Sequence, residues 1–406
     1  MPHSPEYDWS KQASNAGANL GARLDGAMRE VRSFWQRVSE GVSVQQLWGQ
    51  FMAEARTSYG LYSREVDWEP VEGERGAKRF WRITRALFWA MMMKLSPARR
   101  VFFLIGLVLV FLALVNLRPF GWPRELYIAL AAGALLFLLA LELADRVTMK
   151  RDLEIAKEIQ RWLVPSAPPV VPGLDIAFTT RPANTVAGDY YDAFLRPTPG
   201  DANPSSSGAT TPPSQRLLLV VADVAGKSVP AALLMATFQA SLHTLAFLTS
   251  PTLPDLVAGL NGYACAHSVG GLRFTTAFLA ELEPTTRALT YVSAGHNAPI
   301  LRRASGRIER LEAGGLPLGI MADARHDYGN TRLNSGDLLV IFTDGVIEAE
   351  NSAGEEYGES RLLQLLASPP SSSARDDLNR LTTSLDSFVG AARQHDDITC
   401  LVLRCL

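Results

Sequence analysis

Two long apolar runs restrict what this chain can fold into. They cover residues 101–117 and 126–144, and a short turn containing two prolines separates them. Each run is close to the roughly 17–25 residues that cross a bilayer, and its interior lacks the polar stripe of a helix in a soluble bundle. Glu142, near the end of the second run, is the exception. We therefore expect a transmembrane helical hairpin; two buried helices of a soluble bundle are the alternative.

Basic residues lie mainly outside this hairpin. Those that flank it are Lys94, Arg99, Arg100, Arg146, Lys150 and Arg151, whereas the turn contains Arg118 and Arg124. Because basic residues favour the cytoplasmic side, we expect a two-pass protein of the inner (cytoplasmic) membrane whose N-terminus and C-terminal domain are both cytoplasmic. The chain starts without an early apolar run, so no cleavable signal peptide is expected.

The rest of the chain divides into four segments. Residues 1–79 predict an N-terminal helical region, with two short amphipathic helices between residues 21 and 52. Residues 80–100 mix basic and aromatic side chains, which is typical of a helix at a membrane interface. Residues 145–165 predict a linker helix that ends at Pro165, and residues 166–406 predict a folded domain.

The linker helix has a periodic face. Its members recur at intervals of four and three residues: Met149, Leu153, Ala156, Gln160 and Leu163. This spacing is that of a short coiled-coil seam, so we expect a homodimer through this helix. Packing of the same face on the next domain is the alternative.

Composition excludes several classes of function. The formal net charge is −2, which provides no basic field for nucleic acid. The three cysteines, Cys265, Cys400 and Cys405, lack the paired spacing of a zinc site or a disulfide framework, which fits a reducing compartment. No arginine follows Cys265 or Cys400 at the spacing of a phosphate-binding cysteine loop, and Cys405 is the penultimate residue. A cysteine-nucleophile phosphatase is therefore disfavoured.

The C-terminal segment alternates short strands with grouped helices. The predicted strands are 174–180, 189–195, 217–224, 275–282, 289–293, 299–303, 337–343 and 399–403, and the predicted helices are 229–249, 360–367 and 375–388. Strands at both ends with helices grouped between them predict an α+β sandwich. The Pro-, Ser- and Gly-rich interval 196–216 is expected to be a loop without chemistry of its own.

Four aspartates stand where apolar, β-rich runs end. They are Asp189, Asp223, Asp344 and Asp396. Carboxylates at strand ends can be directed at a common point, and hard oxygen ligands suit Mg²⁺ or Mn²⁺. A pair of such ions promotes phosphoryl transfer, so the pattern indicates metal-assisted hydrolysis of a phosphate ester. Four unrelated turn aspartates are the alternative.

Ordered motifs surround these aspartates. They are Leu153–Gln160 with Leu163–Pro165, Arg181–Ala183, Gly188–Asp192, Ala222–Ala232, Arg273–Ala277, Ser293–Pro299, Gly336–Asp337, Phe342–Ala349 and Asp396–Thr399. In this order the motifs, which extend over residues 151–403, resemble the SpoIIE/RsbU-type bacterial serine phosphatases. Two positions depart from the pattern: Ala187 stands where glycine is frequent, and Val224-Ala225 precede Gly226 where eukaryotic relatives place glycine beside the bridging aspartate. Neither removes a carboxylate.

The resemblance implies the metal-dependent PPM phosphatase fold, a β-sandwich flanked by helices that holds two Mn²⁺ or Mg²⁺ ions. It implies that Asp189 binds one ion, that Asp223 bridges both with help from the Val224 carbonyl, and that Asp344 and Asp396 hold the other. Asp192 and Asp397 would support these ligands or bind through water. A metal-activated water would then hydrolyse phosphoserine or phosphothreonine, with phosphorylated STAS-type anti-anti-sigma proteins as substrates.

Three side chains near these motifs have simpler interpretations. Asp192 can be a turn residue without a metal role, and His296 is expected to be a turn residue whose ring bonds the backbone. Arg181 can contact substrate phosphate, although a solvated surface arginine is the simpler expectation. The alternative for the whole domain is a catalytically silent PPM module that acts by membrane-tethered binding.

Overall fold

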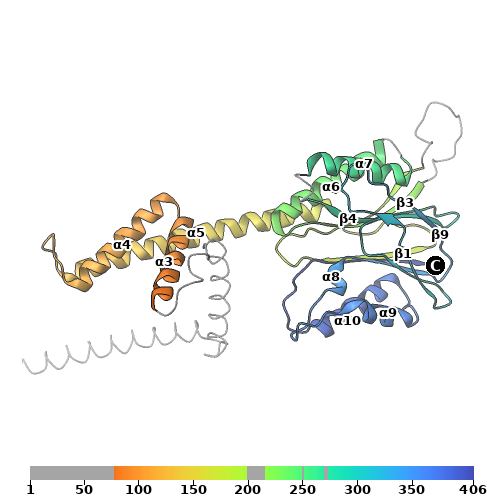
Figure 1. The fold of residues 1–406 in the computed structure, drawn as a ribbon. Helices are drawn as coiled ribbons and strands as arrows, with labels where there is room; N and C mark the ends of the chain where they lie inside the picture. The colour runs from red at the N-terminus through yellow and green to blue at the C-terminus, as the bar shows by residue number, and fades with distance from the viewer. Residues whose placement is uncertain (1–76, 199–214, 249–250, 269–272) are drawn as a thin grey trace, which may run out of the picture. The chain divides into compact units, whose positions relative to one another are not determined.

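The computed structural model describes residues 77–198, 215–248, 251–268 and 273–406 (Figure 1). The two amphipathic helices predicted between residues 21 and 52 lie outside these ranges. The chain divides into two compact units, and the boundary between them in the sequence lies between Leu143 and Ala144. Each unit is described by itself below.

The described part of the first unit is helical. It contains α3 (Ala77–Lys94), α4 (Pro97–Val115) and the first half of α5 (Arg124–Leu163). α4 begins with a proline in its first turn, and Asn116 ends it in the left-handed conformation. Gly106 of α4 faces Leu135 of α5, where an added Cβ would be 3.4 Å from the leucine side chain. This close approach packs the two apolar helices against each other.

Large apolar side chains cover the outside of this helix pair. Exposed examples are Leu104, Val108, Phe111, Leu136, Phe137 and Leu139. The acidic residue of the second apolar run, Glu142, forms an ion pair with Arg99 at 3.3 Å. Apolar side chains that face outward together are what a helix pair in lipid presents, whereas a soluble protein would bury them.

Among the described residues, three helices are long and apolar enough to cross a membrane: Pro97–Val115, Arg124–Leu163 and Ser228–Phe247. The third belongs to the second unit, where its apolar residues Met235, Phe238 and Leu242 are buried against a sheet. Packing in a protein core thus accounts for the third helix, and the first two remain as membrane candidates.

α5 continues without a break from the second apolar run through the predicted linker to Leu163. After it, the described part of the second unit contains two sheets (Figure 1). The five-stranded sheet has the order β1 (Leu174–Arg181), β11 (Ile398–Cys405), β10 (Leu338–Phe342), β6 (Ile300–Arg302), β7 (Ile308–Arg310). The six-stranded sheet has the order β2 (Tyr190–Pro197), β3 (Gln215–Val224), β4 (Thr275–Leu282), β5 (Ala288–Ala294), β8 (Gly314–Gly315), and β9 (Gly329–Arg332) also pairs with β5.

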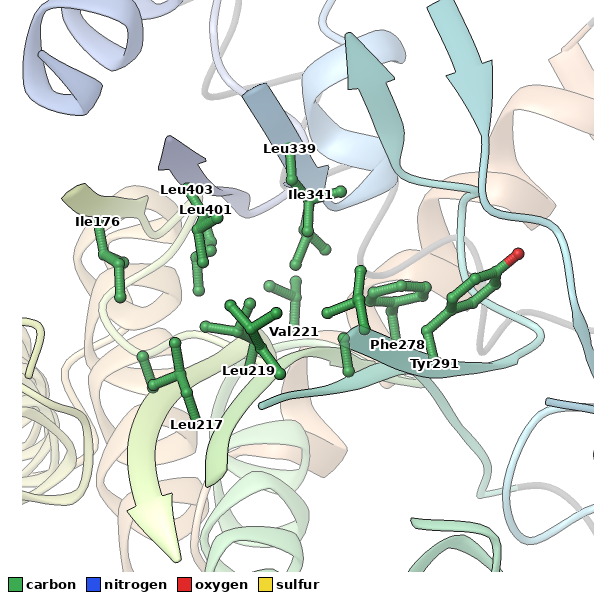
Figure 2. Close-up of a cluster of buried hydrophobic side chains, with 14 of the residues drawn as sticks. Ile176, Leu217, Leu219, Val221, Phe278, Tyr291, Leu339, Ile341, Leu401 and Leu403 are labelled. Atoms are coloured by element: carbon green, nitrogen blue, oxygen red, sulfur yellow. The ribbon is translucent and has the colours of Figure 1, made fainter. Parts of the chain in front are cut away.

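The two sheets pack face to face through alternate residues of their strands. Ile341 of β10 is opposite Leu401 of β11 in the register, and Val221 of β3 is opposite Phe278 of β4. Figure 2 shows these side chains directed from the two sheets toward each other. The period-two alternation of the sequence therefore produces the central apolar layer.

Helices cover the outer face of each sheet (Figure 1). α6 (Ser228–Leu248) and α7 (Leu253–His267) pack on the six-stranded sheet. α9 (Gly358–Ala367) and α10 (Ala374–Val389) pack on the five-stranded sheet. Ser373 caps α10, because its side chain accepts the main-chain N–H of Asp376. The predicted α+β sandwich flanked by helices is confirmed.

The sequence prediction missed α7 and the short α8 (Asp344–Ile347). α7 contains Gly259 and Gly262, which lower its helix propensity. Gly259 has a packing reason, since an added Cβ would lie 3.1 Å from Leu245 of α6. The helix forms because burial of Leu253, Leu256, Val257 and Leu260 outweighs the cost of two glycines.

Candidate active site

The four predicted aspartates come from both sheets. Asp189 immediately precedes β2 and Asp223 is the penultimate residue of β3, so both belong to the six-stranded sheet. Asp344 is the first residue of α8, which follows β10, and Asp396 lies just before β11, so both belong to the five-stranded sheet. The sandwich therefore brings carboxylates from two sheets to one edge.

Electrostatics indicates that these carboxylates face one another. Burial, followed by the nearby charges of Asp344 and Asp396, raises the pKa of Asp223 to about 7. Burial, followed by the charge of Asp223, raises the pKa of Asp189 well above its ordinary value. Burial and then Asp396 also raise the pKa of Asp344. Each carboxylate thus disfavours ionisation of a neighbour.

Asp189 is buried and held by Thr343, whose hydroxyl donates to its Oδ2 at 2.9 Å. The same hydroxyl accepts the main-chain N–H of Thr399 at 3.0 Å. Thr343 therefore fixes one metal-ligand candidate from the opposite sheet. The Thr-Asp-Gly motif contains this residue, but no pattern in the sequence assigns it a separate role.

Asp397 organises the loop in front of Asp189. Its two carboxylate oxygens accept the main-chain N–H groups of Ala183 at 2.7 Å and Gly188 at 2.6 Å. Burial raises the pKa of Asp397 more than these hydrogen bonds lower it. We predicted that Asp397 supports the metal ligands; the structure shows it bound to the main chain before Asp189, and the role at a metal stays a prediction.

Gly345 and Gly188 permit close approach of the backbone at this edge. A Cβ on Gly345 would lie 2.0 Å from the carbonyl oxygen of Asp397, which no side chain can occupy. A Cβ on Gly188 would lie 3.2 Å from the Val224 carbonyl oxygen and 3.7 Å from Oδ1 of Asp223. The Val224 carbonyl, predicted to assist a metal, therefore lies beside the loop that carries Asp189.

Lys227 joins α6 to the last of the four aspartates. Its Nζ donates to Oδ2 of Asp396 at 3.1 Å and to the carbonyl of His395 at 2.9 Å. Both partners are exposed enough that this ion pair contributes little to stability. Lys227 belongs to the quoted Ala222–Ala232 motif, but spacing alone could not pair it with a residue so distant in sequence.

Asp192 has different partners from those we expected. Its Oδ2 accepts the Tyr190 hydroxyl at 2.6 Å and lies 2.8 Å from Nε2 of His243 on α6, and its Oδ1 accepts the N–H of Ala193 at 2.7 Å. These bonds attach β2 to α6 and do not reach the other aspartates. These contacts of Asp192 therefore do not support the role at the metals that we predicted for it.

Arg181 and His296 are both engaged within the protein. Arg181 forms a two-pronged ion pair with Asp386 of α10, at 2.5 and 3.1 Å. Nδ1 of buried His296 lies 3.1 Å from the hydroxyl of Thr276, a side-chain partner that we did not predict. Burial lowers the pKa of His296 to about 4, which keeps the ring neutral at physiological pH.

A cavity of about 390 Å³ opens beside the aspartates. Its lining includes Arg181, Lys227, Glu348, Asp386, Gln394 and Asp396. Residues of both signs line it, and its volume is in the range of ordinary ligand sites. Of the four aspartates, Asp396 is the one that lines this cavity.

The donor set suits hard divalent cations, because it consists of carboxylates and a main-chain carbonyl. Within the described ranges, no three Asp, Glu, His or Cys side chains are already gathered closely enough to hold an ion. Protein donors hold Asp189 and Asp396 instead, namely Thr343 and Lys227. The fit therefore rests on the chemistry of the donors and on the mutual repulsion that a cation would relieve.

Comparison with known proteins finds a matching family profile and similar sequences. A profile of the family described as Stage II sporulation protein E (SpoIIE) matches residues 213–406. The phosphoserine phosphatase RsbU of Bacillus subtilis is 29% identical over 257 residues, which cover 63% of this chain and 70% of that protein. Protein IcfG of Synechocystis sp. is 25% identical over 291 residues, which cover 66% of this chain and 43% of that protein. The chain thus spans less than half the length of the latter relative.

A solved structure supports the fold. The SiaA-PP2C domain of Pseudomonas aeruginosa superimposes with a TM-score of 0.53 at 20% sequence identity, and covers 64% of this chain and 98% of that domain. At this identity the likeness establishes the sandwich architecture and not the chemistry.

Proposed function

We propose that this protein is a membrane-anchored, metal-dependent protein-serine/threonine phosphatase whose C-terminal part is a PP2C-type domain of the SpoIIE family. One observation carries the proposal. Burial, and after it the charge of a neighbouring aspartate, raises the pKa values of Asp189, Asp223 and Asp344 at the edge where the two sheets bring these carboxylates. Without a bound cation, the repulsion among these carboxylates lowers the stability of the fold. Carboxylates with perturbed pKa values cluster at functional sites.

The resemblance of the motifs to SpoIIE/RsbU-type phosphatases implies the roles of the residues. Asp189, Asp223 and the Val224 carbonyl would hold one ion, and Asp223, Asp344 and Asp396 the other. Two Mn²⁺ or Mg²⁺ ions, when bound, would supply an activated water and offset the negative charge of the phosphoryl group. Thr343 keeps Asp189 in place by its hydrogen bond, and Asp397 keeps the preceding loop in place through Ala183 and Gly188.

The proposed substrate is a phosphoserine or phosphothreonine in a protein. The relative RsbU is named as a phosphoserine phosphatase, which supports this class. The resemblance of the motifs to SpoIIE/RsbU-type enzymes extends the proposal to phosphorylated STAS-type anti-anti-sigma proteins. The cavity beside Asp396 is open to solvent at Lys227 and Arg181, so a phosphorylated side chain can enter from the surface.

The remaining predictions complete the proposal. Residues 101–117 and 126–144 cross the inner membrane, with the N-terminus and residues 145–406 in the cytoplasm. The linker helix pairs with that of a second copy. The face we predicted for this pairing needs correction, because Gln160 contacts Ala187 of its own domain. The exposed apolar residues Ile155, Ile159 and Trp162 form another face with helical spacing, and we assign the dimer contact to them.

The experiment is hydrolysis of an aryl phosphate and of a phosphoserine peptide by the full chain in detergent. Activity is expected with Mn²⁺ or Mg²⁺, to disappear with EDTA and to return when the metal is restored. Asp344→Asn and Asp396→Asn should each reduce the rate at least tenfold, because each removes a charged metal-ligand candidate. Absence of turnover at every metal concentration would favour the alternative, a catalytically silent domain that acts by binding.

A further inference from the structure

The side chain of Lys227 lies on the wall of the cavity beside Asp396. Its Nζ donates to Oδ2 of Asp396 at 3.1 Å and to the carbonyl oxygen of His395 at 2.9 Å. A lysine ammonium carries three N–H donors, and within the described part of the chain the third has no protein acceptor. Because the side chain is 58% exposed, this donor is accessible to a molecule in the cavity.

The turn between β3 and α6 holds Lys227 at this position. Its two neighbours, Gly226 and Ser228, both have positive φ angles, of 121° and 62°. Just before them, Ala225 donates its N–H to the carbonyl of Phe274 at 2.9 Å. A serine in the left-handed region is unfavourable unless the surrounding structure fixes it, and such residues gather at functional sites. The turn thus places Lys227 at the edge where β3 ends.

The charged side chains on the cavity wall are mostly acidic. The acidic ones are Glu348, Glu350, Glu356, Asp386 and Asp396, and the lysine and arginine side chains are those of Lys227 and Arg181. A phosphate monoester carries between one and two negative charges at neutral pH, so it binds where a cation can offset them. Lys227 and Arg181 are therefore the two candidates on this wall for contact with a phosphoryl group.

Of these two cations, Lys227 is the one beside the metal-ligand candidates. Arg181 forms its two-pronged ion pair with Asp386, which is not one of the four aspartates. Burial raises the pKa of Asp344, and the ammonium of Lys227 acts against that rise. The charge of Lys227 thus reaches Asp344 as well as Asp396. A phosphoryl group at this cluster would therefore lie close to Lys227.

We propose that Lys227 binds the phosphoryl group of the substrate by donating its third N–H to a non-bridging oxygen of the phosphate monoester. The inference rests on the proposed function and deepens it. In hydrolysis the bond from phosphorus to the serine or threonine oxygen breaks, the hydroxyl of water joins phosphorus, and a water proton ends on the released oxygen. Lys227 keeps its three protons throughout. It offsets part of the charge of the phosphoryl oxygens and fixes their orientation.

The test compares three variants of the full chain in detergent. Lys227→Met removes the ammonium and keeps an unbranched side chain, and Lys227→Arg keeps a positive charge with several donors. Arg393→Met is the matched control for the loss of one positive charge. Arg393 is an exposed residue two positions before His395, and it does not line the cavity.

Three measurements separate contact with phosphate from support of a metal ligand. The first is KM for a phosphoserine peptide at saturating Mg²⁺. The second is the rise in melting temperature that inorganic phosphate causes at saturating Mg²⁺, and the third is the rise that Mg²⁺ causes alone. A ligand that binds the folded state raises the melting temperature whether or not the protein turns it over.

Lys227→Met should raise both KM and the phosphate concentration for half of the melting shift roughly tenfold, the cost of one charged hydrogen bond. Its response to Mg²⁺ alone should be unchanged or should occur at a lower concentration, because an ammonium beside Asp396 opposes a cation there. Lys227→Arg should lie between Lys227→Met and the wild type. Arg393→Met should match the wild type in all three measurements.

An unchanged KM and an unchanged phosphate response in Lys227→Met would overturn the inference, as would a wild type whose melting temperature does not respond to phosphate. Equal weakening of the Mg²⁺ and phosphate responses would overturn it too, because Lys227 would then support Asp396. The same loss in Arg393→Met would reduce the effect to general surface charge. Failure of the proposed function is distinguishable, since it would appear as a wild type without turnover, whereas the melting shifts do not require turnover.

Discussion

Thr343 and Asp189 are joined by a 2.9 Å hydrogen bond that connects the end of β10 in one sheet to the start of β2 in the other. Thr343→Val keeps the shape of the side chain and removes the donor. Asp189 then loses a bond that stabilises its charged form, and the N–H of Thr399 loses its acceptor. We expect a cost of about 1–3 kcal/mol in the free energy of unfolding and weaker metal binding. Chemical denaturation and Mn²⁺ titration of the rate measure the two effects.

Asp223→Asn should abolish turnover, since a neutral amide cannot balance two divalent ions. A residual rate above about a tenth of the wild type would contradict a bridging role, because changes around a metal site commonly cost 10–100-fold on their own. The rate is measured at saturating Mn²⁺ and Mg²⁺. Arg181→Ala is the control: its pair with Asp386 is about half exposed, so stability and rate should change little.

The same Asp223→Asn substitution should stabilise the metal-free protein. The pKa of Asp223 is raised from 3.8 to about 7 in the folded state, so between these pH values the folded state binds more protons than the unfolded state. The contribution of this group to stability is therefore present below about pH 4 and is lost as the pH rises to 7. In EDTA at pH 8 the variant should melt a few degrees higher than the wild type. An equal or lower melting temperature of the variant would contradict the repulsion between Asp223 and the neighbouring carboxylates.

Gly345→Ala should disrupt the active-site edge, because the new Cβ would lie 2.0 Å from the carbonyl oxygen of Asp397. The backbone that carries Asp344 or Asp396 must move, so we expect loss of at least nine-tenths of the activity and about 1–3 kcal/mol of stability, the range for an overpacked site. Gly262→Ala in α7 is the matched control. No heavy atom lies within 4 Å of its added Cβ, and alanine favours a helix, so stability should be unchanged or higher.

Dimer formation through α5 is tested by charge at its exposed apolar face. Ile155→Glu combined with Ile159→Glu should yield a monomer, whereas Arg161→Glu, with the same change in charge on an exposed residue of the same helix, should remain a dimer. Light scattering corrected for detergent measures the mass. A double variant that keeps the wild-type mass would exclude this face as the contact.

Much of the second unit could be predicted from local pattern. The strand 275–282 was predicted with the bounds that β4 has, because its apolar run ends at clear turn signals. The four aspartates were identified because each lies at one end of such a run, before the strand for Asp189 and Asp396 and at or after its end for Asp223 and Asp344. Where local pattern was weak, prediction failed: α7 depends on burial against α6 and the six-stranded sheet, which outweighs its two glycines.

Contacts between residues far apart along the chain could not be predicted from the sequence. Asp192 seemed to belong with the other aspartates because it is three positions from Asp189, but residues on a strand alternate in direction, and its partner is His243 on α6. Likewise, the heptad spacing placed Gln160 in a dimer seam. The structure turns it toward Ala187, because a buried main-chain pair needs an amide there.

Because α5 is continuous from Arg124 to Leu163, the number of residues in it sets the rotation of one end of the helix relative to the other. Each residue added to an α-helix turns everything beyond it by about 100°. An insertion of seven residues after Lys150 would leave Gln160 facing nearly the same direction relative to the apolar run. An insertion of two residues would turn it by about 200°. The length of α5 therefore determines the direction in which its last turns face relative to its first.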